Sequence, residues 1–151
     1  MICMQIEKLT RADFREVLEM MRIFYASDAL LVHPDEQTLC TTLRCATEEN
    51  PYLTGYGFWM GEELAGYGMV TKSFSTEMGG ICVWIEDIYI RPEFRDQGIG
   101  TAFLRFVEEQ YRETAVRLRL EAEPENERAM AVYRKAGFQI LGYTQLVKEL
   151  Q

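Results

Sequence analysis

Basic residues are in the minority in this 151-residue sequence, and their shortage argues against one broad class of function. Lysine and arginine number 16 against 24 aspartates and glutamates, which gives a formal net charge of −8 at pH 7. Nucleic-acid binding proteins set a basic patch against the phosphate backbone. We therefore expect no nucleic-acid partner. The acidic surface tolerates cationic partners, although the same charge also serves solubility alone.

Paired cysteines and long apolar runs are also missing. The four cysteines, Cys3, Cys40, Cys45 and Cys82, form no C-x-x-C pair and lie in apolar stretches. We interpret them as reduced hydrophobic residues and expect no metal site. No window approaches the roughly 18 continuous apolar residues of a membrane span, and the N-terminus lacks the pattern of a signal peptide. We therefore expect a cytoplasmic protein without a membrane partner.

What is present is enough apolar material for one packed domain, expected over residues 1–151. Hydrophobic residues make up 48% of the chain and aromatic residues 12%, which suffices for a single core. The periodicity predicts one three-layer α/β domain, in which a central mixed sheet is flanked by helices. The expected elements are a strand at 3–9, a helix from 10–13 to 25, a helix ending near 50, strands at 56–60, 64–74 and 81–90, a helix at 98–111, a strand at 116–120, a helix at 126–136 and a last strand at 143–150.

A glycine-rich turn between the strand at 81–90 and the following helix is the first chemical signal. A helix N-terminus leaves backbone N–H groups without partners and has a partial positive charge, so it favours anions. Gly98 and Gly100 have no side chains to block such a site, and Arg95 adds a cation at its edge. Asp96 is unfavourable there unless it points to solvent. The turn therefore predicts a pyrophosphate site, although G-x-G alone also serves plain tight turns.

Two better-known nucleotide motifs are absent from the same segment. Phe103 occupies the third glycine position of the dinucleotide pattern G-x-G-x-x-G, and the lysine of a P-loop is missing. A dinucleotide-dependent enzyme and an ATPase are therefore not indicated.

Two segments resemble the GNAT N-acetyltransferase superfamily. Residues 86–100 read Glu-Asp-Ile-Tyr-Ile-Arg-Pro-Glu-Phe-Arg-Asp-Gln-Gly-Ile-Gly, and they resemble the acetyl-CoA motif of Gln or Arg, two residues, Gly, one residue, then Gly or Ala. The order of elements is similar along the whole chain, and the sharp resemblance covers 86–138. The second match, to a pattern of Asn, Ala, Tyr and a terminal Gly-Phe, lies at Asn126, Ala129, Tyr133, Gly137 and Phe138.

This resemblance implies a GNAT fold and acetyl-CoA as the cofactor. It places backbone groups of Ile88 and Ile90 along the pantetheine arm and the N–H groups of 95–101 on the pyrophosphate. Asn126 and Tyr133 would approach the thioester. The full set of expected cofactor-binding residues is Ile88, Tyr89, Ile90, Arg95, Asp96, Gln97, Gly98, Ile99, Gly100, Thr101, Asn126, Ala129 and Tyr133.

Acetyl transfer to an amine needs a proton acceptor for the attacking nitrogen and a proton donor for the departing thiolate. Strand alternation places Glu86 on one face with Trp84, Ile88 and Ile90, where apolar neighbours raise its pKa, and points Asp87 the other way. Glu86 is thus the expected general base, directly or through water, and pairing with a cation is the alternative. The resemblance to diamine-type acetyltransferases, which have Glu-Asp here, favours the base.

Tyr133 is the expected general acid, because its phenol stays protonated at neutral pH. The alternative is a core residue beside Ala129 and Met130. The expected oxyanion donor is the backbone N–H of Ile88.

The acceptor is expected to be a small cationic primary amine, and by analogy with relatives we expect a homodimer. A lysine or N-terminal amine on a protein is the alternative acceptor. Two further alternatives are a CoA-binding regulatory protein without activity and a structural domain whose G-x-G is only a turn. CoA release separates the first from an enzyme, and a thermal shift with CoA separates the second. The candidate acceptor contacts are Phe24, Tyr25, His33, Trp84, Glu86 and Tyr143.

Overall fold

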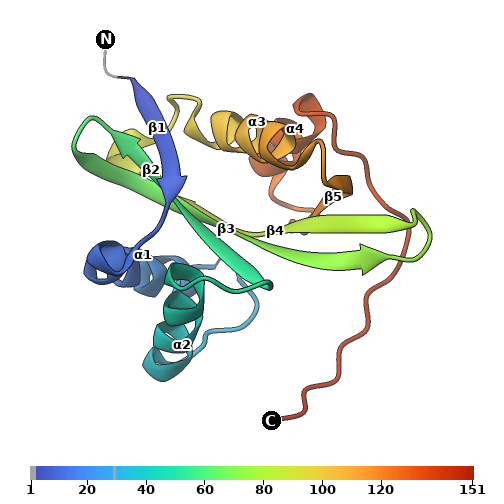
Figure 1. Ribbon diagram of the computed structural model, residues 1–151, viewed down its shortest axis with the longest axis horizontal. Coiled ribbons are helices and arrows are strands. Elements are labelled where there is room, and N and C mark those ends of the chain that lie inside the picture. The colour runs from blue at the N-terminus through green and yellow to red at the C-terminus, as the bar shows by residue number, and fades with distance from the viewer. Residues whose placement is uncertain (1–2, 29) are drawn as a thin grey trace.

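A five-stranded mixed sheet organises the chain in the computed structural model, which describes residues 3–28 and 30–151 (Figure 1). The sheet order is β1-β2-β3-β4-β5; the first three pairings are antiparallel and β4 pairs with β5 in parallel. The strands are β1 Met4–Lys8, β2 Leu53–Met60, β3 Glu63–Ser75, β4 Gly80–Ile90 and β5 Ala115–Leu120.

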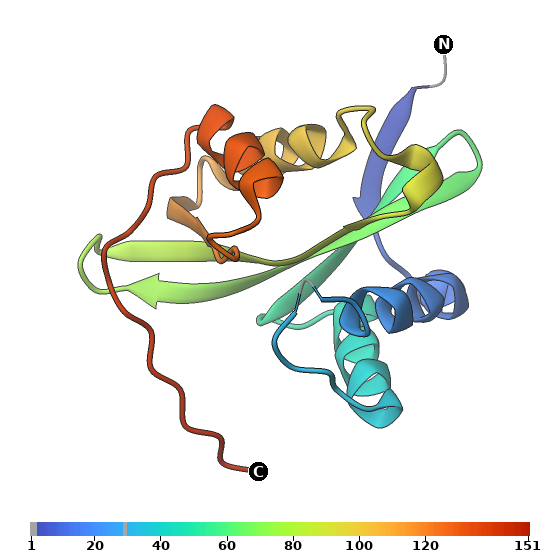
Figure 2. The same ribbon diagram turned by 180° about the vertical axis from the view of Figure 1, so that it is seen from behind.

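Helices cover both faces of this sheet, as Figures 1 and 2 show from opposite sides. One face packs against α1 and α2, and the other against α3 and α4. The expected mixed sheet between helical layers is therefore confirmed, with the expected order of elements up to α4. The helices are α1 Phe14–Tyr25, α2 Glu36–Thr47, α3 Ile99–Tyr111 and α4 Glu127–Lys135.

Each face of the sheet has its own apolar core. Tyr67, Met69 and Tyr89 pack with the buried residues of α1 and α2. Phe58 and Val83 belong to the other core, which includes the α3 residues Phe103 and Val107. Alternate residues of the central strands face opposite cores, because successive side chains of a strand point to opposite faces.

The prediction of a last strand at 143–150 is wrong. Residues 137–151 form no regular secondary structure, because the chain passes the end of the β3–β4 hairpin and then runs away from the sheet (Figures 1 and 2). The Tyr143 hydroxyl donates to Glu77 Oε2 at 3.0 Å, which attaches the chain to the turn between β3 and β4. The backbone beyond it consequently has no neighbouring strand.

Candidate active site

Strand β4 continues alone beyond the end of its neighbour β5, and we call the point where their pairing ends the fork. Their pairing ends at Ile85 and Leu120, while β4 continues to Ile90. Arg95 Nε donates to the Ile90 carbonyl at 2.9 Å, so this carbonyl points toward the fork and not toward β3. Ile88 lies two residues earlier. In an antiparallel pair, the backbone groups of every second residue point to the same edge of the strand, so the N–H and C=O of Ile88 also point toward the fork. The fork thus presents a free strand edge that includes Ile88.

The N-terminus of α3 opens beside this fork. Gly98 precedes the helix with φ +78°, in the left-handed region where L side chains are strained, and no side chain caps the helix end. A Cβ added at Gly98 would meet no atom within 4 Å, and one at Gly100 would meet only Ile90 Cδ1 at 3.7 Å. The space above these glycines is therefore open, and we call the first-turn N–H groups of α3 with this space the cradle, because free N–H groups at a helix start favour anions.

Two charged residues frame the cradle. Asp96 has φ +62°, and its carboxylate forms an ion pair with Arg128 of α4. This pair offsets the negative charge that was expected to be unfavourable next to a phosphate. Arg95, which binds the Ile90 carbonyl, also lies 5.9 Å from the centre of the Tyr89 ring. The cradle, the cationic Arg95 and the free edge of β4 are thus contiguous.

A β-bulge in β4 changes the expected position of Glu86. Met69 pairs with Asp87 and Val70 with Ile85, so Glu86 is an extra residue without a partner on β3. The side chain is exposed and accepts a hydrogen bond from Thr71 Oγ1 at 2.8 Å. The prediction that apolar neighbours surround Glu86 is therefore wrong. No cation pairs with it among residues 3–28 and 30–151.

The bulge also reverses the alternation after Glu86. Ile88 and Ile90 pack on the α3 side, in the same core as Val83 and Ile85. Asp87 consequently turns to the α1 side with Trp84, whereas the sequence predicted opposite faces for these two residues. Glu86 marks the point where β4 leaves β5, so its carboxylate lies at the mouth of the fork.

Asp87 is the functional candidate that the sequence reasoning missed. It is 5% exposed, and its carboxylate accepts hydrogen bonds from the hydroxyls of Tyr25, at 2.8 and 2.9 Å, and Tyr67, at 3.1 Å. Burial raises the pKa of Asp87 to about 6, the two tyrosine hydroxyls lower it, and the neighbouring Glu86 raises it. Burial also raises the pKa of both tyrosines, so they remain donors. In the sequence, the only indication that Asp87 is a functional candidate was its place in the adjacent pair Glu86-Asp87.

The Asp87 pKa makes stability depend on pH. A carboxyl with a pKa of about 6 in the fold, against an ordinary 3.8, binds more protons folded than unfolded between these values. The free energy of unfolding should therefore fall as the pH rises from about 4 to about 6, by up to about 3 kcal/mol. Asp87→Asn should remove this fall, as measured by urea unfolding at several pH values. Exposed Glu93→Gln is the control, and a variant curve parallel to the wild-type curve would refute the assignment.

Tyr133 lies on α4 and faces the second core. Its ring meets Phe138 edge-on at 6.3 Å between centroids. Burial raises the pKa of this phenol, so it is protonated at neutral pH. No hydrogen-bond partner reaches its hydroxyl within the described part of the chain. A protonated and unengaged phenol is available to donate to a ligand.

Asn126 has a structural role in this conformation. Its Oδ1 accepts from the Ala129 N–H at 3.2 Å and caps α4. Of the other expected cradle residues, Gln97 donates weakly to the Glu93 carbonyl at 3.5 Å. Thr101 lies in the first turn of α3 behind Ile99 and Gly100.

The expected acceptor residues separate into three places. Tyr25 reaches Asp87, and His33 Nδ1 lies 2.6 Å from the Tyr25 carbonyl, so α1 and the following loop meet near the fork. Phe24 is instead part of an aromatic cluster with Tyr25, Tyr67 and Tyr89. Of the other three residues, Glu86 lies at the mouth of the fork, Trp84 lies beside β5 and Tyr143 contacts the β3–β4 turn.

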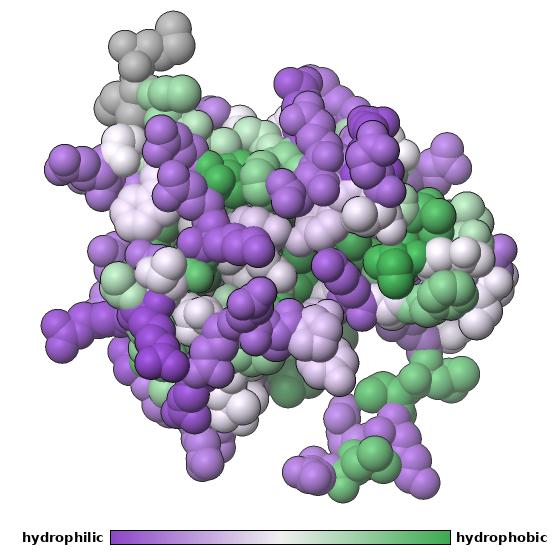
Figure 3. All heavy atoms as spheres, viewed as in Figure 1, coloured by the Kyte–Doolittle hydropathy of each residue, from purple (hydrophilic) through white to green (hydrophobic). Residues whose placement is uncertain are grey.

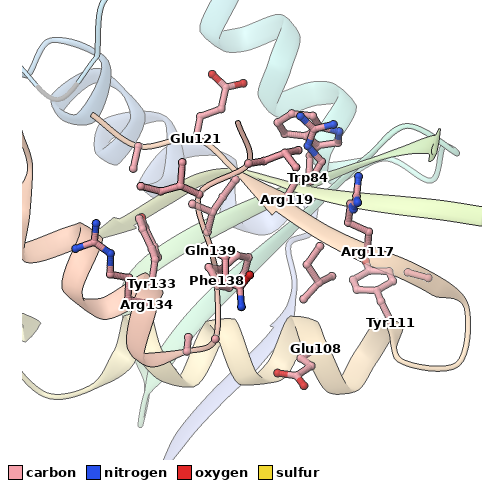
Figure 4. Close-up of a pocket in the computed structure, with 18 of the residues that line it drawn as sticks. Trp84, Glu108, Tyr111, Arg117, Arg119, Glu121, Tyr133, Arg134, Phe138 and Gln139 are labelled. Carbon is pink, nitrogen blue, oxygen red and sulfur yellow. The ribbon is translucent and has the colours of Figure 1, made fainter. Parts of the chain in front are cut away.

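A cavity of about 930 Å³ borders β5 next to the fork (Figure 4). Trp84 and Arg119 lie on one side of β5 and Tyr133 and Phe138 on the other. The Arg119 guanidinium stacks 4.2 Å from the centre of the Trp84 ring. Two expected site residues, Trp84 and Tyr133, therefore line one hollow.

Two negative findings apply to residues 3–28 and 30–151. No group of three histidine, cysteine, aspartate or glutamate side chains is placed to hold a metal ion. No helix in these ranges is both long enough and apolar enough to cross a membrane.

The glycine-rich turn thus lies at the N-terminus of α3 beside β4, as the family resemblance of the sequence implies. The chain belongs to the acetyltransferase (GNAT) family, whose model matches residues 14–138. It is similar to the thialysine N-epsilon-acetyltransferase of Bos taurus, with 38% identity over 90 residues, 59% of this chain and 52% of the relative. The match thus spans about half the length of that relative.

Solved structures share the fold. A possible acetyltransferase from Clostridium difficile 630 superimposes with a TM-score of 0.85 and 19% identity, covering 98% of both chains. An aminoglycoside N-acetyltransferase in complex with CoA gives a TM-score of 0.80 and 13% identity, covering 100% of this chain and 97% of its own.

Proposed function

We propose that this chain is an N-acetyltransferase that moves the acetyl group of acetyl-CoA to the primary amine of a small cationic molecule. The observation that supports this most is the juxtaposition of the fork and the cradle. The free edge of β4 at Ile88 leads directly to the open helix end at Gly98. An extended arm with a diphosphate at one end matches both features.

In this proposal, acetyl-CoA is a substrate held mainly by backbone groups. Ile88 and Ile90 face the pantetheine arm in strand fashion, and the N–H groups from Arg95 to Thr101 face the pyrophosphate. Arg95 supplies a positive charge at the junction. The open space above Gly98 and Gly100 fits this ligand, because a Cβ at either position would meet little else in the protein.

The chemistry forms a C–N bond and breaks a C–S bond. The neutral amine nitrogen attacks the thioester carbonyl carbon, and the Ile88 N–H donates to the developing oxyanion. The nitrogen loses a proton to Glu86, directly or through water, and the thiolate sulfur gains one from Tyr133. The exposed position of Glu86 at the fork supports the first proton transfer, and the unengaged Tyr133 hydroxyl supports the second.

Two carboxyl groups at the fork favour a cationic acceptor. Glu86 is exposed at the mouth, and Asp87 lies behind it with Tyr25. The net charge of −8 and relatives that act on thialysine, a small amine, agree with this choice. A protein amine is the second candidate. We further propose a cytoplasmic location, which the four free cysteines of the described chain suit, and, by analogy with relatives, a homodimer.

A panel of amines tests the acceptor class. Thiol release from acetyl-CoA should be fastest with small diamines and amino acids that have a side-chain amine, and slower with aminoglycosides and peptides. Preference for a peptide by kcat/KM would contradict the small-amine assignment. CoA binding, seen as a thermal shift, without release for any amine would indicate a binding protein instead.

Glu86→Gln tests the base. Removing a general base lowers turnover by roughly a hundredfold or more, and the acetyl-CoA dissociation constant should change little because the carboxylate lies outside the cradle. Steady-state kinetics against pH gives the measurement, and Glu7→Gln, at an exposed residue of β1, is the matched control. Unaltered turnover across the pH range would remove Glu86 from the mechanism.

A further inference from the structure

The C-terminal end of α1 is bonded to β4 through one buried carboxylate. The Tyr25 hydroxyl, on the last residue of α1, lies between the two oxygens of Asp87, at 2.8 Å from Oδ1 and 2.9 Å from Oδ2. The Tyr67 hydroxyl of β3 donates to Oδ2 at 3.1 Å. Hydrogen bonds to a buried charged group are costly to break, because the group is left without water. Asp87 therefore fixes the end of α1 against the sheet.

The segment that follows α1 closes on the same tyrosine. Residues 26–35 connect α1 to α2, and we call them the α1–α2 loop. His33 Nδ1 lies 2.6 Å from the Tyr25 carbonyl, and Nδ1 is the donor because a carbonyl only accepts. Arg22 of α1 forms an ion pair with Glu36, the first residue of α2. The two ends of the loop are thus held together, as in compact surface loops that are frequently functional.

The two halves of α1 are attached to the sheet by different contacts. Near the start of the helix, Glu16 pairs at 3.2 Å with Arg91, which directly follows β4. At the end of the helix, the Tyr25 ring meets Phe24 edge-on and its hydroxyl reaches Asp87. The outer surface over α1 and α2 is mainly hydrophilic (Figure 3), so solvent surrounds these helices on that side. The Tyr25 hydroxyl therefore joins both the helix end and the loop to β4.

The β-bulge brings this attachment next to the proposed base. Glu86 is the extra residue of the bulge, and Asp87 is the residue after it. The Glu86 side chain is exposed at the mouth of the fork, whereas Asp87 is buried on the α1 side. The end of α1 is therefore one hydrogen bond away from the residue that follows the base. The position of the α1–α2 loop relative to Glu86 depends on that bond.

We propose that Asp87 is a positioning residue which, through Tyr25, holds the α1–α2 loop beside Glu86 as one wall of the acceptor site. This inference rests on the proposed function, because it assigns the space between the loop and Glu86 to the amine. Attack on the thioester needs the nitrogen within about 3–3.5 Å of the carbonyl carbon. A loop that moves freely lowers the fraction of protein that is ready to bind the amine. Asp87 itself, buried behind Glu86, contacts neither substrate.

Tyr25→Phe tests the attachment, with Tyr67→Phe as its matched control. Each variant removes one hydroxyl from Asp87 and keeps the aromatic ring, but only Tyr25 belongs to α1. We expect the amine KM of Tyr25→Phe to rise roughly tenfold, because apparent affinity falls with the competent fraction. Its kcat and CoA dissociation constant should change little, and Tyr67→Phe should keep the wild-type KM. An unchanged KM in Tyr25→Phe, or an equal rise in both variants, would overturn the proposal.

Substitutions of Asp87 separate positioning from a direct contact between Tyr25 and the amine. Asp87→Leu removes the acceptor and leaves Tyr25 in place, so the amine KM should rise as in Tyr25→Phe. Asp87→Asn keeps one acceptor oxygen and should restore most of the affinity. The double variant Tyr25→Phe/Asp87→Leu should be no worse than either single variant, because both act through one bond. Additive effects, or an Asp87→Asn as poor as Asp87→Leu, would overturn the proposal.

Hydrogen exchange of the free protein tests the attachment without catalysis. Backbone amides within 27–35 should exchange roughly ten- to a hundredfold faster in Tyr25→Phe than in wild type or Tyr67→Phe, which is the scale of one hydrogen bond to a charged group. Equal exchange in all three proteins would overturn the proposal. Faster exchange in Tyr25→Phe, together with a wild type that acetylates no amine, would confirm the attachment and refute the proposed function, so the two failures are distinguishable.

Discussion

Gly98→Ala is expected to weaken acetyl-CoA binding by roughly ten- to a hundredfold, or about 1.4–2.8 kcal/mol. The residue has φ +78°, and a Cβ there would project into space that no protein atom occupies within 4 Å. In the proposed site this space belongs to the pyrophosphate. The methyl group would hold the diphosphate away from the first N–H groups of α3, and isothermal titration calorimetry with CoA measures the loss.

Backbone strain has to be separated from this effect. A left-handed backbone costs an alanine roughly 1–2 kcal/mol in folding, and Gly79 offers a matched control. It has φ +68°, an added Cβ also meets nothing within 4 Å, and it lies in the β3–β4 turn. Gly79→Ala should therefore lose similar stability and keep CoA affinity. Equal loss of affinity in the two variants would contradict the cradle.

Tyr133→Phe is expected to lower turnover by a hundredfold to a thousandfold, because a general acid contributes in this range. The substitution removes one hydroxyl and keeps the ring that packs on Phe138. The hydroxyl has no partner in the described chain that its loss would leave unsatisfied, so stability and CoA affinity should change little. Pre-steady-state thiol release measures the chemical step directly.

An exposed tyrosine provides the comparison for this variant. Tyr52 is 72% exposed and does not line the cavity, so Tyr52→Phe should leave turnover intact. Unchanged turnover in Tyr133→Phe would assign Tyr133 to the core alone. A large loss of CoA affinity with normal turnover at saturation would assign it to binding instead.

Much of the fold could be predicted, because the local sequence patterns for helices and turns agree with the packing that the structure shows. The apolar stripe of α3 gave the helix, and the glycines before it gave its start. Gly98 was expected as a turn residue, and the structure shows the left-handed backbone that requires it. The helix expected to begin at 10–13 has a cap there, since the Thr10 N–H donates to Asp13 Oδ2 at 2.8 Å.

The β-bulge at Glu86 could not be predicted from the alternation of side chains along β4. A bulge inserts one residue without changing the composition of the strand, and its position depends on the partner strand. Alternation alone therefore predicted apolar neighbours for Glu86 and placed Asp87 on the opposite face of the strand. In the structure Asp87 is the buried carboxyl, and its pKa is raised because burial outweighs the hydrogen bonds from Tyr25 and Tyr67.

The end of the chain shows a second limit. Leu146, Val147 and Leu150 have the composition of a strand, but a strand needs a partner that local sequence does not specify. Within a single chain these residues remain outside the sheet. Strand propensity thus predicted a strand at 143–150 that the structure does not contain.

Transfer of the acetyl group itself is the most direct test of the proposed function. The purified protein is incubated with acetyl-CoA labelled in the acetyl group and with a small diamine, and mass spectrometry follows the amine. We predict a labelled N-acetyl amine formed in equal amount to free CoA, with Gly98→Ala and Tyr133→Phe both slow. Free CoA without an acetylated amine, or no transfer to any amine of the panel, would contradict it.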